Sequence, residues 1–144
     1  MKSILVTGCA GFIGSNFVPY FLEKEKNYKI VNLDLLTYAG DLDNLKECEN
    51  HLNYTFIGGD IRDRTLVEKI FKEHDIQGVI HFAAESHVDN SIKNPGVFIE
   101  TNVNGTYTLV DVARTTGWRN HLPIMISIKT VDFIIYQKMK CMVH

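Results

Sequence analysis

Short apolar runs alternate with longer amphipathic segments along the first 116 residues of the chain. The runs of strand length are residues 2–8, 28–34, 54–60 and 78–84. The segments with apolar side chains at helical spacing are residues 12–25, 65–74 and 94–117. Because strands that alternate with helices form parallel sheets covered on both faces, this order predicts a doubly wound α/β fold.

Individual residues refine the predicted helices. The apolar stripes of the first two helices are Ile13, Phe17 and Phe21, and then Leu66, Val67, Ile70 and Phe71. Pro19 should kink the first helix or deprive it of a backbone hydrogen bond. The third helix is expected to begin after Asn94 as N-cap, to carry Pro95 in its first position and to stop at Gly117.

Composition narrows the class of protein without assigning a function. The chain is 45% hydrophobic and 22% charged with a net charge of −2, so nothing indicates a nucleic-acid or anionic-membrane surface. No apolar run approaches the roughly 18 residues of a membrane span, and the N-terminus lacks a signal peptide, so a cytoplasmic protein is expected. The cysteines at positions 9, 48 and 141 have no metal-type spacing, which favours reduced thiols and no metal site.

The segment TGCAGFIGS joins the first strand to the first helix and carries Gly8, Gly11 and Gly14 at intervals of three. In dinucleotide-binding folds the first such glycine permits a tight turn and the second lets backbone approach a pyrophosphate. The third lets the helix pack against the strand, and the free N–H groups of the helix favour phosphate. The segment therefore predicts a Rossmann-type dinucleotide site.

Two carboxylates follow the second and third strands. Asp34 lies about twenty residues beyond the glycines, where a carboxylate can accept hydrogen bonds from adenosine ribose hydroxyls and would repel a 2′-phosphate. This favours NAD over NADP, although a solvated carboxylate at a strand end is the simpler alternative. Asp60 is placed to meet the adenine, with Ile61 packing on it, but taken alone it is a typical turn residue.

Four segments resemble the dTDP-glucose 4,6-dehydratases, which are lyases of the extended short-chain dehydrogenase/reductase family. They are TGCAGFIGS, NLDLLTYAG at residues 32–40, HFAAESHVDNSIKNP at residues 81–95 and FIETNVNGTYTLVDVAR at residues 98–114. The resemblance covers residues 1 to about 115, the N-terminal part of such an enzyme. It implies that the chain stops before the substrate domain and that the full-length protein is a homodimer, in part through the helix at residues 95–116.

The resemblance also implies the site residues. The implied NAD contacts are Gly8, Gly11, Phe12, Ile13, Gly14, Asp34, Leu35, Leu36, Thr37, Asp60, Ile61, Phe82, Ala83, Ala84, Glu85, Ser86 and Thr101. Ser86 and His87 would also face the sugar nucleotide, although both are equally able to cap a turn. Asn90 stands where the family commonly has arginine, and Cys9 stands where glycine is usual, which is expected to bring its side chain close to a phosphate. His81, on an apolar strand, is expected to be a core residue.

The implied reaction converts dTDP-glucose to dTDP-4-keto-6-deoxyglucose in deoxysugar (rhamnose-type) biosynthesis. Hydride leaves carbon 4, water is lost across carbons 5 and 6, and the hydride returns to carbon 6. A tyrosinate near a lysine is the base, and an Asp-Glu pair drives the elimination. Tyr136 and Lys140 have the Tyr-x-x-x-Lys spacing, but no Thr-Asp-Glu segment precedes them. We therefore interpret this pair as a chance match and expect no intact catalytic group.

Residues 117–144 differ from the rest of the chain. All 10 glycines lie at or before Gly117, and residues 118–144 hold four basic residues and one acidic residue. Codons for residues 131–144, read two nucleotides along, permit Arg-Phe-Tyr-His-Ile-Ser, then Lys or Glu, then Asp-Glu-Val-Tyr-Gly-Ser. This resembles the family's fifth strand and its Ser-Thr-Asp-Glu-Val-Tyr-Gly run. The sequence thus predicts a partial NAD-binding domain at residues 1–116 and an out-of-frame tail at residues 117–144.

Three other functions stay open at this point. One is an NAD-binding module without catalysis, and another is a non-functional product whose open sheet edge invites aggregation. A third is a related nucleotide-sugar epimerase or decarboxylase, although the segments LTYAG and AAESHVD favour the dehydratases.

Overall fold

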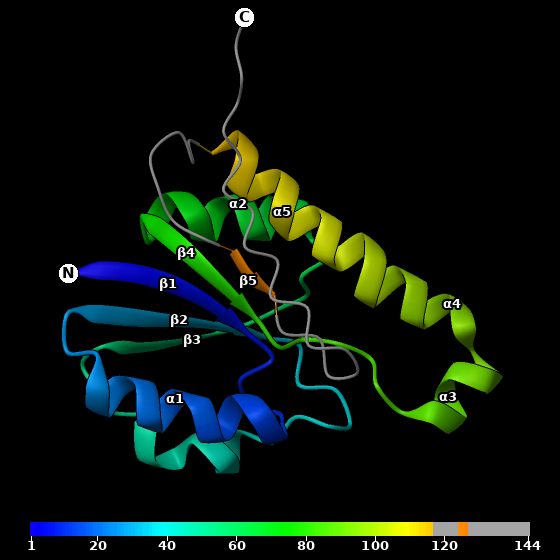
Figure 1. Ribbon diagram of the computed structural model, residues 1–144, viewed down its shortest axis with the longest axis horizontal. Coiled ribbons are helices and arrows are strands. Elements are labelled where there is room, and N and C mark those ends of the chain that lie inside the picture. The colour runs from blue at the N-terminus through cyan, green and yellow to red at the C-terminus, as the bar shows by residue number, and fades with distance from the viewer. Residues whose placement is uncertain (117–123, 127–144) are drawn as a thin grey trace, which may run out of the picture.

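The computed structural model describes residues 1–116 and the backbone of residues 124–126 (Figure 1). The strands are β1 (Lys2–Thr7), β2 (Tyr28–Asp34), β3 (Tyr54–Gly58), β4 (Ile76–His81) and β5 (Ile124–Ile126). The helices are α1 (Phe12–Lys24), α2 (Arg64–Glu73), α3 (Val88–Lys93), α4 (Pro95–Phe98) and α5 (Thr106–Thr115), with the 3₁₀ helix η1 (Leu42–Cys48) and the π-helix η2 (Ile99–Gly105).

The strands form one parallel sheet in the order β3-β2-β1-β4-β5. The chain moves outward from β1 to β3 and then crosses back to place β4 on the other side of β1. The order therefore reverses between β1 and β4, and the crevice at the carboxyl ends of these strands is where such sheets bind ligands. The predicted doubly wound α/β fold is confirmed.

An apolar layer covers each face of the sheet, and successive side chains along a strand point into one layer and then into the other. Leu5 and Val31 face the layer beneath α2 and α5, whereas Ile4, Val6 and Ile30 face the layer beneath α1 and η1. Figure 1 shows α1 on one side of the sheet and α2 with α5 on the other. Strands buried on both faces read as continuous apolar runs, which is why all four predicted strands were found.

The apolar stripe predicted for α1 was wrong by one position. The fully buried residues of this helix are Gly14, Val18 and Leu22, while Ile13 is 37% exposed. Phe17 and Phe21 pack at the margin of the same layer. Gly14 allows the helix to approach the turn after β1 most closely, and this contact rotates the helix so that the large aromatic residues flank it. The helix runs through Pro19 without ending.

Two helices escaped sequence analysis, and the long third helix is not uniform. Helix α3 has no buried residue, so it lacks an apolar stripe. The 3₁₀ helix η1 buries Leu45 and Cys48, but one pair in seven residues is too short a pattern to predict a helix. The third helix begins with Pro95 after Asn94, as predicted, but the Asn94 side chain makes no capping hydrogen bond. It then contains the π-helical turns of η2 before α5, and Gly117 lies outside the described residues.

The third and fourth strands were predicted to continue two and three residues farther than they do. β3 stops at Gly58 and β4 at His81, so Asp60 and residues 82–84 belong to loops.

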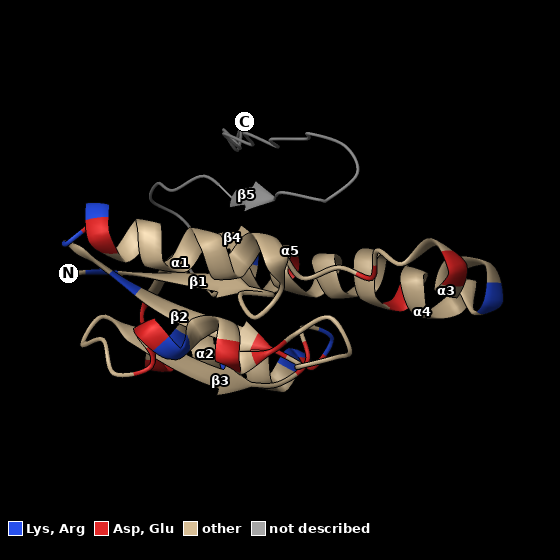
Figure 2. Cartoon of the chain, turned by 90° about the horizontal axis from the view of Figure 1, so that it is seen from below, with Lys and Arg blue, Asp and Glu red and all other residues tan. Residues whose placement is uncertain are grey.

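None of the helices in residues 1–116 combines the length and apolar character needed to cross a bilayer. Figure 2 shows basic residues scattered among acidic ones along the chain, not gathered over one element.

We expect Gly14→Ala to destabilise the fold strongly. A Cβ at position 14 would stand 2.5 Å from the Cα of Cys9 and 2.5 Å from the carbonyl oxygen of Gly8, and neither backbone atom can move freely. The cost should be about 2 kcal/mol or more, measured by urea unfolding. Gly58→Ala is the matched control, because its Cβ would meet only the Phe56 ring at 3.7 Å and should change stability by less than about 1 kcal/mol. Equal effects of both substitutions would contradict this account of the turn.

Candidate functional site

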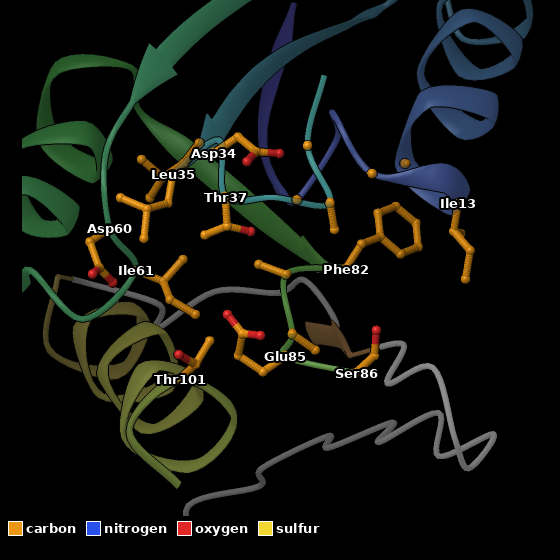
Figure 3. Close-up of a pocket in the computed structure, with 18 of the residues that line it drawn as sticks. Ile13, Asp34, Leu35, Thr37, Asp60, Ile61, Phe82, Glu85, Ser86 and Thr101 are labelled. Carbon is orange, nitrogen blue, oxygen red and sulfur yellow. The ribbon is translucent and has the colours of Figure 1, made fainter. Parts of the chain in front are cut away.

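A pocket opens at the carboxyl ends of the strands, at the point where the strand order reverses (Figure 3). Its walls come from the turns and loops that follow β1, β2, β3 and β4, together with η2. The lining residues are Gly8, Gly11, Phe12, Ile13, Gly14, Leu33, Asp34, Leu35, Thr37, Ala39, Gly40, Gly59, Asp60, Ile61, Phe82, Ala83, Ala84, Glu85, Ser86 and Thr101. Segments distant in sequence therefore meet in one concave surface.

The structure brings together every residue of the predicted cofactor set except Leu36. Leu36 has a positive φ of 55°, and its N–H donates to Asp34, which leaves its side chain outside the lining. His87, predicted to face a substrate, also lies outside the lining; it is the N-cap residue of α3, with its ring edge-on to Tyr38. Four further residues of the lining were not predicted from the sequence: Leu33, Ala39, Gly40 and Gly59. The paired glycines in GGD were a usable signal for Gly59.

The glycine turn is shaped by close backbone contacts. Gly8 has a φ of 71°, in the left-handed region, and a Cβ there would stand 2.5 Å from the nitrogen of Ala83. Helix α1 then starts with Gly11 as N-cap, without a side-chain cap and without an acidic residue in its first turn. Its first N–H groups are therefore available beside pocket residues Gly11, Phe12 and Ile13.

The expectation that the Cys9 side chain lies close to a bound phosphate was wrong. Cys9 is fully buried, and its Sγ donates to the carbonyl oxygen of Val6 at 3.6 Å, within the apolar layer beneath α1. Burial, aided by the charge of Asp34, raises the pKa of the thiol well above its usual value. The cysteine side chain at this position therefore packs in the core and does not line the pocket.

Asp34 is a structural part of the turn and not a solvated carboxylate. It is 8% exposed, and Oδ2 accepts from the Ala10 N–H while Oδ1 accepts from the Leu36 N–H, both at 2.9 Å. The Ala10 carbonyl in turn accepts from the Asp41 N–H and from Asn44 Nδ2, both at 3.2 Å. The loop after β2 is therefore tied to the glycine turn, and each Asp34 oxygen keeps a second lone pair for a ligand hydroxyl.

Asp60 forms a local turn and also lines the pocket. Its Oδ1 accepts from the Arg62 N–H at 2.8 Å, which makes a local turn, and its Oδ2 pairs with Arg62 Nη2 at 2.6 Å. The guanidinium holds the pKa of Asp60 below its usual range. Asp60 also lines the pocket beside Ile61. Arg62 itself is outside the lining, so no Lys, Arg or His among the described residues faces the pocket.

The opposite wall, residues 82–86, is held at Glu85. The Glu85 N–H donates to Asn102 Oδ1 at 2.8 Å, and Asn102 Nδ2 donates to the Glu85 carbonyl at 2.9 Å. The Tyr38 hydroxyl donates to Glu85 Oε2 at 3.2 Å, which joins the loops after β2 and β4. Neither Tyr38 nor Asn102 was singled out from the sequence, because their partner is 47 and 17 residues away.

His81 is a core residue, as predicted. It is 2% exposed, with Nδ1 2.6 Å from Thr7 Oγ1 and Nε2 3.0 Å from Thr106 Oγ1. Burial lowers the pKa of His81 to about 4. It lies at the end of β4, behind the pocket wall, and does not line the cavity.

The arrangement can bind an extended ligand that carries hydroxyls and phosphates. Phosphate would meet main-chain N–H groups of α1, and hydroxyls would meet Asp34. Within residues 1–116 the lining has no tyrosine–lysine pair, and no group of three metal-ligating side chains occurs in the part of the chain described here. Tyr136 and Lys140 lie outside the described residues.

A parallel sheet, a glycine turn opening the first helix and a strand-end carboxylate define a Rossmann-type nucleotide-binding domain. Residues 5–130 match the family described as GDP-mannose 4,6 dehydratase, so the chain belongs to that family. Two curated relatives are the low-salt glycan biosynthesis protein Agl12 of Haloferax volcanii and the dTDP-glucose 4,6-dehydratase of Xanthomonas campestris. The Haloferax protein is 53% identical to this chain over 110 residues, which are 76% of this chain and 34% of the relative. The Xanthomonas protein is 50% identical over 114 residues, which are 79% of this chain and 32% of the relative. The chain spans about a third of the relatives that it matches.

Solved structures give the same picture. The dTDP-glucose 4,6-dehydratase of Bacillus anthracis, crystallised with NAD, is 43% identical with a TM-score of 0.73, over 89% of this chain and 37% of that one. The UDP-glucose 4-epimerase of Thermotoga maritima, solved with UDP-glucose, has a TM-score of 0.74 but only 31% sequence identity. The match covers 87% of this chain and 37% of the epimerase chain. The backbone fits both enzymes equally well, whereas the sequence is nearer to the dehydratase.

Burial of His81 should make the fold acid-sensitive. In the unfolded chain His81 takes up a proton below about pH 6.5, but in the folded protein only below about pH 4. The unfolded state therefore binds more protons between these values, and stability should fall as the pH drops, by up to about 3 kcal/mol. Urea unfolding from pH 7 to 4 measures this loss, and His81→Gln should remove that part of the slope. Exposed His87, changed to Gln, is the control; if the slope survives in His81→Gln, the interpretation is wrong.

Proposed function

We propose that residues 1–116 bind NAD and that the whole protein is a dTDP-glucose 4,6-dehydratase, a lyase that converts dTDP-glucose to dTDP-4-keto-6-deoxyglucose. The observation that carries the proposal is the pocket at the strand-order reversal, lined by all but one of the residues that family resemblance implies for NAD. The identities of 50% and 43% to two dTDP-glucose 4,6-dehydratases support the substrate class.

The residues present fit a dinucleotide. The uncapped start of α1 at residues 11–13 would hold the pyrophosphate through main-chain N–H groups. Asp34 and Thr37 would bind the adenosine ribose, with Asp60 and Ile61 beside the adenine. Residues 82–86 and Thr101 would line the ribose and nicotinamide end. When bound, NAD supplies the acceptor for the hydride from carbon 4 of the sugar and the donor that returns it to carbon 6.

The chain's own residues have a binding and positioning role in this reaction. Ser86 and His87 would face the sugar nucleotide beyond the nicotinamide. The tyrosinate base and the adjacent Asp-Glu pair expected for proton transfer have no counterpart among the lining residues within the described part of the chain. We infer that residues 1–116 form the cofactor half of the site, and that the whole protein is a cytoplasmic homodimer without a metal.

A related epimerase is the second candidate, because the epimerase fold matches equally well. Both enzymes would bind NAD, so cofactor binding does not separate them. Incubation of the complete protein with dTDP-glucose separates them: a dehydratase yields a 4-keto-6-deoxy product, and an epimerase yields a sugar nucleotide of unchanged mass.

The described domain should bind NAD more tightly than NADP. The Asp34 carboxylate would lie close to a 2′-phosphate, and no Lys, Arg or His among the described residues lines the pocket to offset that charge. We expect a preference of at least about tenfold, or about 1.4 kcal/mol, by titration calorimetry. Equal affinity for both dinucleotides, or affinity for neither, would contradict the proposal.

We further propose that residues 117–144 are read out of frame, and that the intended chain continues into the catalytic segment. The family match runs to residue 130, so it does not mark the boundary at residue 116 by itself. The nucleotide sequence from codon 110 to beyond codon 144 tests this. An open shifted frame that encodes Asp-Glu-Val-Tyr-Gly and a later Tyr-x-x-x-Lys is the expected result, and its product should be active. Codons that exclude Asp-Glu-Val-Tyr-Gly would favour a binding module instead.

A further inference from the structure

A chain of polar side chains runs behind the wall of the pocket. Thr7 ends β1, His81 ends β4, and Thr106 begins α5, yet their polar atoms touch in series. Thr7 Oγ1 lies 2.6 Å from His81 Nδ1, and His81 Nε2 lies 3.0 Å from Thr106 Oγ1. Thr7 and His81 are 0% and 2% exposed, so their polar atoms depend on these contacts.

This series of hydrogen bonds ends on a main-chain group at each side. At one end the Ala83 N–H donates to Thr7 Oγ1 at 3.3 Å. At the other end the Thr106 hydroxyl donates to the Asn102 carbonyl at 2.7 Å. The Asn102 amide then holds both main-chain groups of Glu85. The path therefore leaves the pocket wall at Ala83 and returns to it at Glu85.

The two ends determine the direction of every hydrogen bond. A carbonyl only accepts, so the single hydroxyl hydrogen of Thr106 lies on Asn102, and Thr106 Oγ1 must accept from His81 Nε2–H. Neutral His81 then has a bare Nδ1, which accepts the hydroxyl hydrogen of Thr7. This leaves Thr7 Oγ1 as the acceptor for the Ala83 N–H. Each donor meets one acceptor, and one histidine tautomer alone satisfies the set.

We propose that Thr7, His81, Thr106 and Asn102 form a single directional hydrogen-bond relay that positions the pocket wall between Ala83 and Glu85. The relay ties this wall to β1 on one side and to the π-helix η2 on the other. These four are positioning residues, because none of them lines the pocket. The inference deepens the proposed function and rests on it in one respect: the wall in question would hold the nicotinamide end of NAD.

The tautomer of His81 gives a test that is independent of any ligand. Long-range proton–nitrogen NMR of the full chain, labelled with ¹⁵N-histidine, distinguishes Nε2–H from Nδ1–H imidazole. The relay requires His81 to be neutral with the proton on Nε2 at pH 7. An Nδ1–H tautomer or a charged ring overturns the proposal.

Interruption at Thr106 tests the positioning role. Thr106→Val removes the hydroxyl at the end of the relay farthest from Ala83, and Thr106→Ser keeps it. Thr108→Val is the matched control, since Thr108 Oγ1 makes the same bond to a carbonyl four residues back, to Asn104 at 2.9 Å, but does not contact His81. We expect Thr106→Val to shift the amide resonances of Ala83 and Glu85 and to weaken NAD binding about three- to tenfold. Thr106→Ser should restore both, and Thr108→Val should change neither.

The two readouts keep this proposal separate from the proposed function. Failure of the wild-type chain to bind NAD would refute the cofactor proposal, while the Ala83 and Glu85 resonances would still test the relay. If Thr106→Val lowers the melting temperature but leaves these resonances where Thr108→Val leaves them, His81 and Thr106 serve stability alone and the relay is rejected. If Thr106→Val does not fold, the tautomer of the wild-type chain decides.

Discussion

The close approach of main chain to main chain at the end of β1 is the constraint on which the site depends. There is no room for a Cβ at Gly8, which lies against Ala83, or at Gly14, which lies against Cys9. These two contacts bring the end of β1, the loop after β4 and the first turn of α1 into one place. The free N–H groups of that turn consequently open into the crevice between the strands, where they face a ligand.

Most polar side chains around this junction form hydrogen bonds to main-chain groups, and these bonds fix the walls of the pocket. Asp34 binds the N–H groups of Ala10 and Leu36, and Asn102 binds both main-chain groups of Glu85. The only described side-chain charges that line the pocket are carboxylates, at Asp34, Asp60 and Glu85. A phosphate bound there would depend on backbone dipoles instead of cations, which suits a dinucleotide without a 2′-phosphate.

Short-range sequence patterns were sufficient to predict much of the site. Gly11 and Gly14 meet only backbone of the same turn, so their spacing is a local signal, whereas Gly8 also lies against Ala83 of the loop after β4. The strands carry enough apolar residues to be recognised singly. The errors arose where packing between elements decides the outcome. The Cys9 side chain follows the turn into the core, and α1 rotates about Gly14 so that Val18 and Leu22 are buried in place of Ile13.

Residue type and order were enough to establish the parallel α/β fold, the dinucleotide turn and the family, because each depends on short-range periodicity or on a contiguous motif. The partners of Glu85 and His81 were out of reach of that reasoning. Tyr38, Thr7 and Thr106 come to them from other elements, up to 74 residues away. Such pairs form only after the sheet has assembled, since the crossover from β3 to β4 sets which strand ends become neighbours.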